Sequence, residues 1–335
     1  MRLSRFAVLF AILASSLAAL APMTGAQGTT LTIYSGRNEE LVGPIIDQFE
    51  KDTGINVEVR YDNTTTLALA LVEEGKNTPA DIFFAQDAGA LGLLEKNNLL
   101  LELPSYILES VEPRFHSQDG FWVGITGRAR VVTYNTDNVS PEALPESLLG
   151  FADPTWKGRI GFAPTNASFH AHLTALRVEL GDEAMQAFVQ ALVDNEAVPY
   201  EGNSAAVAAV AAGEVDVALV NHYYMFGLLK ENPDAPLANY YFPGDDVGNL
   251  INIAGAAILN SSDNVPLAQQ FIAYMLSRTA QQYFSDSTFE YPLLIGFEAD
   301  PRLVPLAEIQ TPEVDLTDLD DLETTLALLD EVINQ

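Results

Sequence analysis

The sequence predicts an α/β protein of two domains, and three observations lead to this prediction. The chain has 335 residues, of which 48% are hydrophobic, which is enough for a sizeable core and more than one domain. Short apolar runs alternate with segments of helical periodicity. This alternation occurs in residues 31–98 and resumes in residues 128–259. Strands that alternate with helices indicate sheets with right-handed crossover connections.

The first region alternates three times between strand and helix. Strands are expected at residues 31–36, 55–61 and 80–86, and helices at residues 39–54, 64–75 and 88–98. The first helix has one apolar face, formed by Leu41, Ile45, Ile46 and Phe49. Gly54 and Gly75 are expected to end the first two helices, and the threonines at 64–66 to cap the second.

The second region continues the pattern to the end of the chain. Strands are expected at residues 128–137, 159–164, 215–221 and 252–259, and helices at residues 169–181, 205–213, 265–277 and 279–286. Residues 313–335 predict an acidic amphipathic helix with a solvated charged face. Ligand sites of such sheets lie at the carboxyl ends of strands, so we expect a cleft between the two regions.

The N-terminus predicts a cleaved secretory signal peptide over residues 1–26. Arg2 and Arg5 precede an apolar run at residues 6–20, and small residues follow, with cleavage expected near Ala26. The apolar run is short for a membrane anchor. The chain has no cysteine, which excludes disulfides, thiolate metal sites and a lipoprotein anchor. We therefore expect an exported, soluble protein in a periplasm.

The net charge excludes some classes of partner. The chain carries 46 acidic and 16 basic residues, for a formal net charge of −30. Such an acidic surface argues against nucleic acid and anionic membrane as partners.

Two adjacent tyrosines, Tyr223 and Tyr224, follow the expected strand at residues 215–221. Phenolate oxygen is a hard donor that suits a highly charged cation, and a bound cation lowers the pKa of a tyrosine. Both can reach one ion if the backbone turns into a helix there. Tyrosine pairs also pack or cover surface, and the chain has a second pair, Tyr240 and Tyr241. The residues alone leave packing and metal binding both open.

The sequence has no motif for nucleophilic catalysis. It lacks a G-x-S-x-G elbow and a phosphate-binding P-loop. Its histidines are His116, His170, His172 and His222. His170 and His172 are expected at the start of a helix, where residues two apart do not face each other, so a surface or capping role is favoured over a metal site. The numerous carboxylates single out no acid–base pair.

Six segments together resemble the periplasmic ferric-iron-binding proteins of ABC importers. They are LTIYSGRNEELVGPIIDQFEKDTGINVEV, TPADIFFAQDAGALGLLEKNNLL, GRARVVTYNTD, DPTWKGRIGFAPTNASF, EGNSAAVAAVAAGEVDVALVNHYY and AGAAIL, in order from Leu31 to Leu294. WKGRIGFAP and GEVDVALVNHYY are the most specific. The early strand–helix pattern is shared with many solute-binding proteins.

The resemblance implies a two-lobed type II periplasmic-binding-protein fold with an interlobe cleft. It places two crossing hinge strands near residues 128–133 and 252–258. The first lobe would comprise residues 30–128 and 252–300, and the second lobe residues 129–251 and 301–335. A binding protein rather than an enzyme is implied, because no bond in a substrate is broken.

In this family the adjacent tyrosines bind ferric iron, which here means Tyr223 and Tyr224. A synergistic anion, such as carbonate, phosphate or citrate, completes the coordination. The positions that match its binding site are Arg128, Asn166, Ala167, Ser168, Asn203 and Asn221.

The first lobe departs from the family pattern. Some members carry a histidine and a glutamate where this chain has Asn38 and Gln86, and others a tyrosine where it has Glu39. A further tyrosine of other members is replaced near Phe169 and His170. Asn38, Glu39 and Gln86 are therefore the remaining first-lobe candidates for the metal.

The expected partner is the permease of an ABC importer in the cytoplasmic membrane, with the binding protein itself a monomer. Two alternatives stay open. One is a receptor of the same fold for a phosphonate, a polyamine or another small ion. The other is an extracytoplasmic hydrolase, which would need a nucleophile or a carboxylate dyad in the cleft.

Overall fold

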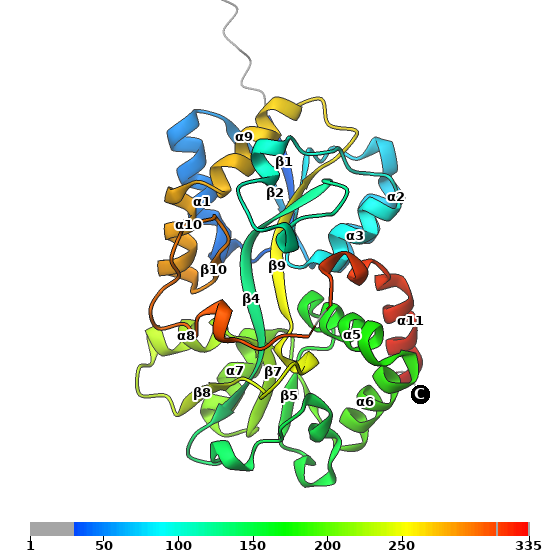
Figure 1. Ribbon diagram of the computed structural model, residues 1–335, viewed down its shortest axis with the longest axis vertical. Coiled ribbons are helices and arrows are strands. Elements are labelled where there is room, and N and C mark those ends of the chain that lie inside the picture. The colour runs from blue at the N-terminus through cyan, green and yellow to red at the C-terminus, as the bar shows by residue number, and fades with distance from the viewer. Residues whose placement is uncertain (1–29, 313, 334–335) are drawn as a thin grey trace, which may run out of the picture.

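The computed structural model describes residues 30–312 and 314–333 (Figure 1). The predicted signal peptide lies outside the described residues. Within them, the strands join into a ten-stranded sheet with the order β2-β1-β3-β9-β4-β7-β5-β6, to which β8 and β10 add at β4. Helices cover this sheet at both ends of an elongated molecule (Figure 1).

The first lobe, as the term is used below, is the half that contains the N-terminal strands. Its strands are β1 (Thr30–Ser35), β2 (Asn56–Tyr61), β3 (Ile82–Ala85) and β10 (Tyr291–Pro292). Its helices are α1 (Glu39–Thr53), α2 (Thr64–Glu74), α3 (Ala88–Lys96), α9 (Val265–Met275) and α10 (Arg278–Tyr283), and α4 (Ser105–Leu108) follows α3. β1 pairs in parallel with both β2 and β3, as crossover connections require. Gly54 has a φ of 72° and ends α1, as predicted.

The second lobe is the other half. Its strands are β5 (Ile160–Phe162), β6 (Val198–Pro199), β7 (Val217–Asn221) and β8 (Leu237–Tyr240). Its helices are α5 (Ala167–Leu180), α6 (Asp182–Asp194), α7 (Asn203–Ala212), α8 (Tyr223–Glu231) and α11 (Leu322–Ile333). β5 lies parallel to β6 and β7.

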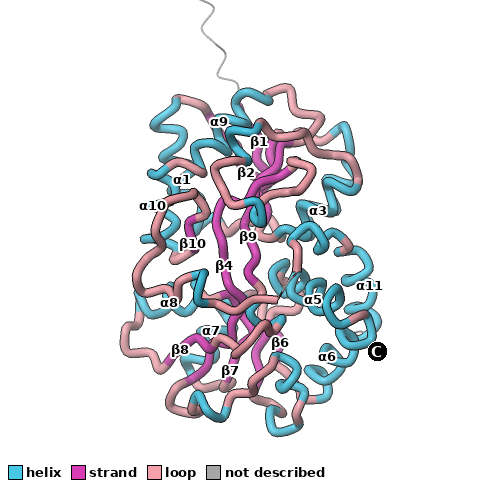
Figure 2. The backbone as a smooth tube through the Cα atoms, in the orientation of Figure 1, coloured by secondary structure: helices cyan, strands magenta, loops and turns pink. Residues whose placement is uncertain are grey.

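Two long antiparallel strands connect the lobes. β4 (Trp122–Asn135) and β9 (Ile251–Ile258) run side by side through the middle of the molecule (Figure 2). β4 pairs with β9 up to Ala129 and with β7 from Arg130 onward, so one strand belongs to both lobes. The predicted hinge strands are confirmed, and β4 starts six residues earlier than predicted because the buried run from Trp122 continues it.

The C-terminal segment also touches both lobes. Its 3-10 turn Leu316–Asp320 packs on α3, where a side chain at Gly89 would come within 2.8 Å of the Leu319 carbonyl oxygen. Helix α11 then packs on α5 and α6. Arg177 of α5 donates to the carbonyl and the carboxylate of Asp321, and this pairing fixes the start of α11.

Three local predictions were wrong. Asn63, not a threonine, caps α2, because its side chain accepts a hydrogen bond from the Thr65 amide. The C-terminal helix covers only Leu322–Ile333, since residues 316–320 form a 3-10 turn. Helix α6 was not predicted, although its buried residues Met185, Phe188, Val189 and Leu192 have helical spacing.

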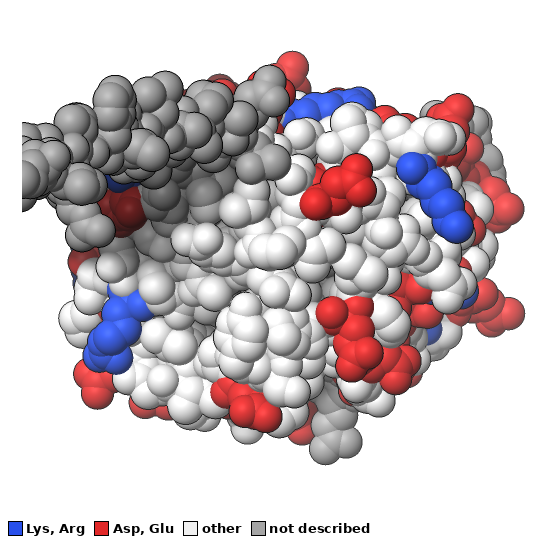
Figure 3. Space-filling view, turned by 90° about the horizontal axis from the view of Figure 1, so that it is seen from above, with Lys and Arg blue, Asp and Glu red and all other residues white. Residues whose placement is uncertain are grey.

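The acidic character of the sequence is visible on the surface. At the first-lobe end, carboxylates are scattered among uncharged residues and outnumber the basic side chains (Figure 3). Within the described part of the chain, no helix is both long enough and apolar enough to cross a membrane.

Candidate functional site

The two tyrosines lie where a buried strand turns directly into a helix. β7 ends at Asn221, only His222 separates it from α8, and Tyr223 and Tyr224 form the first turn of that helix. Their ring centroids are 4.4 Å apart, and Tyr223 is only 2% exposed. Consecutive residues would point to opposite faces of a strand, so the change to helix is what brings both phenols to one place.

Burial affects the ionisation of Tyr224. Burial and then the neighbouring Tyr223 raise the pKa of Tyr224 well above its usual value, whereas Arg37 and Asn203 act in the opposite direction. Tyr224 is therefore a neutral phenol at neutral pH in the absence of a bound cation.

A buried polar network holds Tyr223. Asn221 Nδ2 donates to the Tyr223 hydroxyl at 3.3 Å and to Ser168 Oγ at 3.1 Å. Arg130 Nη1 donates to Asn221 Oδ1 at 3.0 Å, and Nη2 donates to the Leu219 carbonyl at 2.8 Å. Burial and then Arg128 lower the pKa of Arg130 to about 9, which leaves it charged at neutral pH. Arg130 thus acts on the tyrosine through Asn221.

Arg128 is buried and without a protein partner. It lies on β4 opposite Asn252 of β9, it is 0% exposed, and its Nε, Nη1 and Nη2 atoms have no hydrogen-bond partner among the described residues. Burial lowers its pKa, which Tyr223 and Asp87 partly offset. A buried guanidinium without acceptors is unfavourable, so Arg128 is suited to an oxyanion that supplies them.

The first-lobe side of the site contains a third buried arginine. Arg37 Nη2 donates to Glu290 Oε2 at 2.6 Å, and both side chains are almost free of solvent. Burial acts to lower the pKa of Arg37, but Glu290, Tyr223 and Tyr224 together raise it above its usual value. The guanidinium of Arg37, whose charge Glu290 partly neutralises, lies beside the two phenols.

The three first-lobe candidates have different positions. Gln86 is 6% exposed, and its Nε2 donates across the cleft to Ser168 Oγ at 3.0 Å. Asn38 and Glu39 are exposed at the start of α1 and line a cavity with Tyr224. Of the three, Gln86 alone has a hydrogen bond that joins the two lobes.

The predicted anion-binding residues of the second lobe gather at the start of α5 and α7. Asn166 caps α5 by accepting a hydrogen bond from the Ser168 amide, and it accepts another from Asn203 Nδ2. Ala167 is the first residue of α5, with its methyl group buried. Asn203 Oδ1 has no partner among the described residues. Helix N-termini with free donors favour an anion.

Two cavities meet at Tyr224. One has a volume of about 650 Å³ and includes Arg37, Asn38, Gln86 and Asn203 in its lining. The other, of about 370 Å³, is lined by Tyr223, Tyr224 and Phe289. Tyr224 thus borders both cavities, whereas the buried Tyr223 borders only the smaller one.

The structure corrects the expectation for two histidines. His170 and His172 are buried, not on the surface, and neither is the cap of α5. His170 contacts Thr65 Oγ1 across the cleft at 3.1 Å, and His172 lies within hydrogen-bond distance of Arg130 and the Val247 carbonyl. They therefore support the walls of the cleft.

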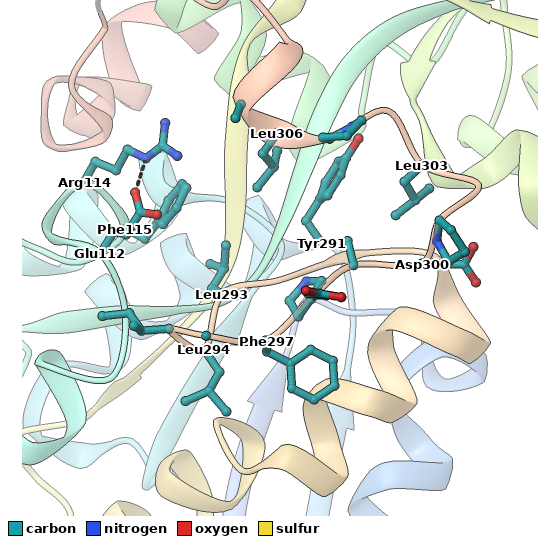
Figure 4. Close-up of a pocket in the computed structure, with 18 residues that line it drawn as sticks. Glu112, Arg114, Phe115, Tyr291, Leu293, Leu294, Phe297, Asp300, Leu303 and Leu306 are labelled. Atoms are coloured by element: carbon teal, nitrogen blue, oxygen red, sulfur yellow. Dashed lines mark hydrogen bonds and ion pairs between the residues drawn. The ribbon is translucent and has the colours of Figure 1, made fainter.

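Another cavity, of about 750 Å³, lies beside β10 and has a mainly apolar lining (Figure 4). Two of the carboxylates in its lining, Glu112 and Asp300, are paired with Arg114 and Arg302. This lining does not suit a hard cation. Among the described residues, no group of three His, Cys, Asp or Glu side chains could hold a metal ion.

Sequence reasoning missed Arg37, Arg130 and Glu290. A signal for Arg130 was present, because residues two apart share a face of a strand, so Arg128 and Arg130 point to the same side. Glu290 is an isolated acid in an apolar segment. Their partners lie 253 and 91 residues away in the chain, which no local pattern reports.

The family model described as bacterial extracellular solute-binding protein matches residues 35–282. The chain belongs to this family. The prediction of a binding protein and not an enzyme is thereby confirmed.

Similar proteins share the whole architecture. The Fe(3+)-binding periplasmic protein of Serratia marcescens is 36% identical over 313 residues, which is 92% of each chain. The crystal structure of iron-bound HitA from Pseudomonas aeruginosa superimposes with a TM-score of 0.87 at 36% identity, covering 91% of this chain and 99% of that one. A Trichodesmium protein in complex with iron and citrate has a TM-score of 0.75 at 28% identity, covering 91% and 100%. The predicted type II periplasmic-binding fold is confirmed.

Proposed function

We propose that this protein captures ferric iron in the interlobe cleft and delivers it to the permease of an ABC importer. The observation that carries the proposal is the pair of phenols, Tyr223 and Tyr224, 4.4 Å apart at the junction of β7 and α8. Two phenolate oxygens are hard anionic donors of the kind that a small trivalent cation prefers. The names of the similar proteins from Serratia marcescens and Pseudomonas aeruginosa support the same cargo.

A synergistic anion, such as carbonate, phosphate or citrate, is the second part of the proposal. The three unpartnered nitrogen atoms of Arg128 would donate to its oxygens, and Asn203 Nδ2, the Ser168 hydroxyl and the start of α5 would donate to others. Ferric iron hydrolyses in neutral water, so the bound anion would occupy positions that hydroxide otherwise takes. Asn38, Glu39 and Gln86 complete the candidate set on the first-lobe side.

The remaining assignments, namely partner, location, lobe boundaries and oligomeric state, are also proposals. Family membership supports an importer permease as partner, and the periplasm as location after removal of residues 1–26. We assign residues 30–128 and 252–300 to one moving lobe and residues 129–251 and 301–335 to the other. The protein would work as a monomer without nucleic acid. Closure of the lobes over the ion excludes water and orders the site.

The test is a titration of the metal-free protein with ferric citrate, followed by visible absorption. A saturable phenolate-to-iron charge-transfer band is expected, and Tyr223→Phe or Tyr224→Phe should abolish it. The second tyrosine pair supplies the matched control, because Tyr240 donates to the Pro145 carbonyl outside the cleft. Tyr240→Phe should leave the band unchanged.

The proposal fails if the wild-type protein shows neither a band nor thermal stabilisation by iron. Binding of a phosphonate, another oxyanion or a polyamine would then identify a different solute. Hydrolysis of an ester or glycoside would instead support the extracytoplasmic hydrolase.

A further inference from the structure

Arg37 is a buried cation to which the proposed metal site assigns no role. It lies in the turn between β1 and α1, immediately before Asn38, and is 2% exposed. A guanidinium does not lose its proton in proteins and has no lone pair to offer, so it cannot be a metal ligand. Its function has to be electrostatic or structural.

Glu290 holds the side chain of Arg37 in place. Glu290 Oε2 accepts from Arg37 at 2.6 Å and from Thr288 Oγ1 at 3.0 Å, and Glu290 Oε1 accepts from Thr126 Oγ1 at 2.8 Å. Thr126 lies on β4 itself. The carboxylate therefore has three donors from three separate segments, which leaves the arginine little freedom to move.

Arg37 also borders the tyrosines of the second lobe. The residue lines the cavity of about 650 Å³ together with Tyr224. Its Nε atom has no hydrogen-bond partner among the described residues. Phe289, adjacent to Glu290, lines the other cavity with Tyr223 and Tyr224. Burial acts to lower the pKa of Arg37, whereas Glu290 and then both phenols raise it.

We propose that Arg37 is the contribution of the first lobe to the metal site: a fixed cation that pairs with the metal-bound phenolates when the lobes are closed. Arg37 belongs to the first lobe and the tyrosines to the second, so opening of the lobes removes this charge from the phenolates. Arg37 is thus a positioning residue that makes retention of the metal depend on closure. This inference rests on the proposed function, because it concerns the same site.

The charge has a spectroscopic consequence that a purely structural ion pair would not have. A cation beside a phenolate stabilises the electron pairs that the charge-transfer transition moves to iron. Removing the cation should shift the band of the iron-loaded protein to longer wavelength. A stronger effect of the cation on the phenolates should shift the band to shorter wavelength.

Two variants separate these effects. Arg37→Met combined with Glu290→Gln removes both charges, so no unpaired charge stays buried. We expect its band at longer wavelength, and release of iron to a chelator roughly tenfold faster, as loss of one charge-assisted hydrogen bond implies. Glu290→Gln alone removes the negative charge that partly neutralises Arg37. The positive charge then acts more strongly on the phenolates, and the band should move to shorter wavelength.

A matched control is available in the same lobe. Arg60 and Glu74 form an exposed ion pair at 3.4 Å, so Arg60→Met with Glu74→Gln should leave band and release rate unchanged. Circular dichroism shows whether the Arg37 and Glu290 double variant folds. If it does not, the band position of the isosteric Glu290→Gln variant alone tests the proposal.

The inference is overturned if the folded variants keep the wild-type band position. Failure of the proposed function looks different, because the wild-type protein itself would then give no tyrosine-dependent band.

Discussion

The two lobes present chemically different sides of one cleft. The second lobe supplies both phenols on a rigid strand–helix junction, and Arg130 and Asn221 hold Tyr223 in place. The first lobe supplies an amide, Gln86, bonded across the cleft, and exposed side chains at the start of α1. This difference indicates that one lobe holds the cargo and the other closes over it. Opening the lobes would then remove the first-lobe contacts and leave the tyrosines in place.

The largest effect is expected from Arg128→Met, on the strand shared by both lobes. Its three unpartnered nitrogen atoms are the proposed site for the anion, and loss of two charge-assisted hydrogen bonds implies roughly a 100-fold loss of iron affinity. The dependence of affinity on bicarbonate concentration should disappear too. Competition with a chelator at several bicarbonate concentrations measures both.

The metal-free Arg128→Met protein should also unfold at a higher temperature, because a buried unpaired charge is removed. Arg114→Met, at an exposed arginine, is the control. Unchanged affinity and unchanged anion dependence in Arg128→Met would refute the anion site.

The two lobes also differ in how a change of pH affects their stability. Burial lowers the pKa of His172 to about 3 and of His222 to about 4, both in the second lobe. The unfolded chain protonates these side chains near pH 6.5, so the free energy of unfolding falls as the pH drops from 6.5 towards these values. Burial raises the pKa of Asp87, in the first lobe, to about 6. The contribution of this residue to the free energy of unfolding is therefore present below about pH 4 and is lost as the pH rises from about 4 to 6.

His172→Asn should therefore reduce the acid sensitivity. The expected change is about 1.4 kcal/mol less stability lost per pH unit below 6.5, since one proton fewer binds on unfolding. Urea denaturation between pH 4.5 and 7 measures it. The assignment is wrong if the slope against pH matches that of the wild type.

A smaller effect is expected for Gln86→Ala. The variant loses the hydrogen bond to Ser168 that joins the lobes, and a net value of about 1 kcal/mol implies roughly fivefold faster release of iron. Stopped-flow transfer to a chelator gives the rate. Gln48→Ala removes an exposed amide on α1 and should have no effect. A release rate in Gln86→Ala equal to that of the wild type would show that this bond does not hold the lobes closed.

The smallest effects are expected for Asn38→Ala and Glu39→Gln. Both side chains are exposed, so each change should alter iron affinity by less than about threefold. The same chelator competition tests this. A loss greater than tenfold in either variant would make that residue a ligand and end the contrast between a holding lobe and a closing lobe.

Much of the fold could be predicted because its signals are local. Gly54 ends α1 through a positive φ, alternation of apolar and polar residues marks β2, and continuous apolar runs mark β3 and β7. The exceptions are also physical. Asn63 caps α2 one residue before the threonines that seemed suited to do so, and the acidic tail forms a 3-10 turn where it crosses α3.

The candidate site, like the fold, could be predicted from the sequence only in part. By itself, the sequence determined that two phenols follow a buried strand, because adjacency in the chain is a local property. Only the tertiary structure decided what surrounds them. Arg37 meets Glu290 from 253 residues away, and Gln86 meets Ser168 from 82. Such contacts depend on how β4 and β9 bring the lobes together, and residue patterns along the chain do not encode the burial that leaves Arg128 without a partner.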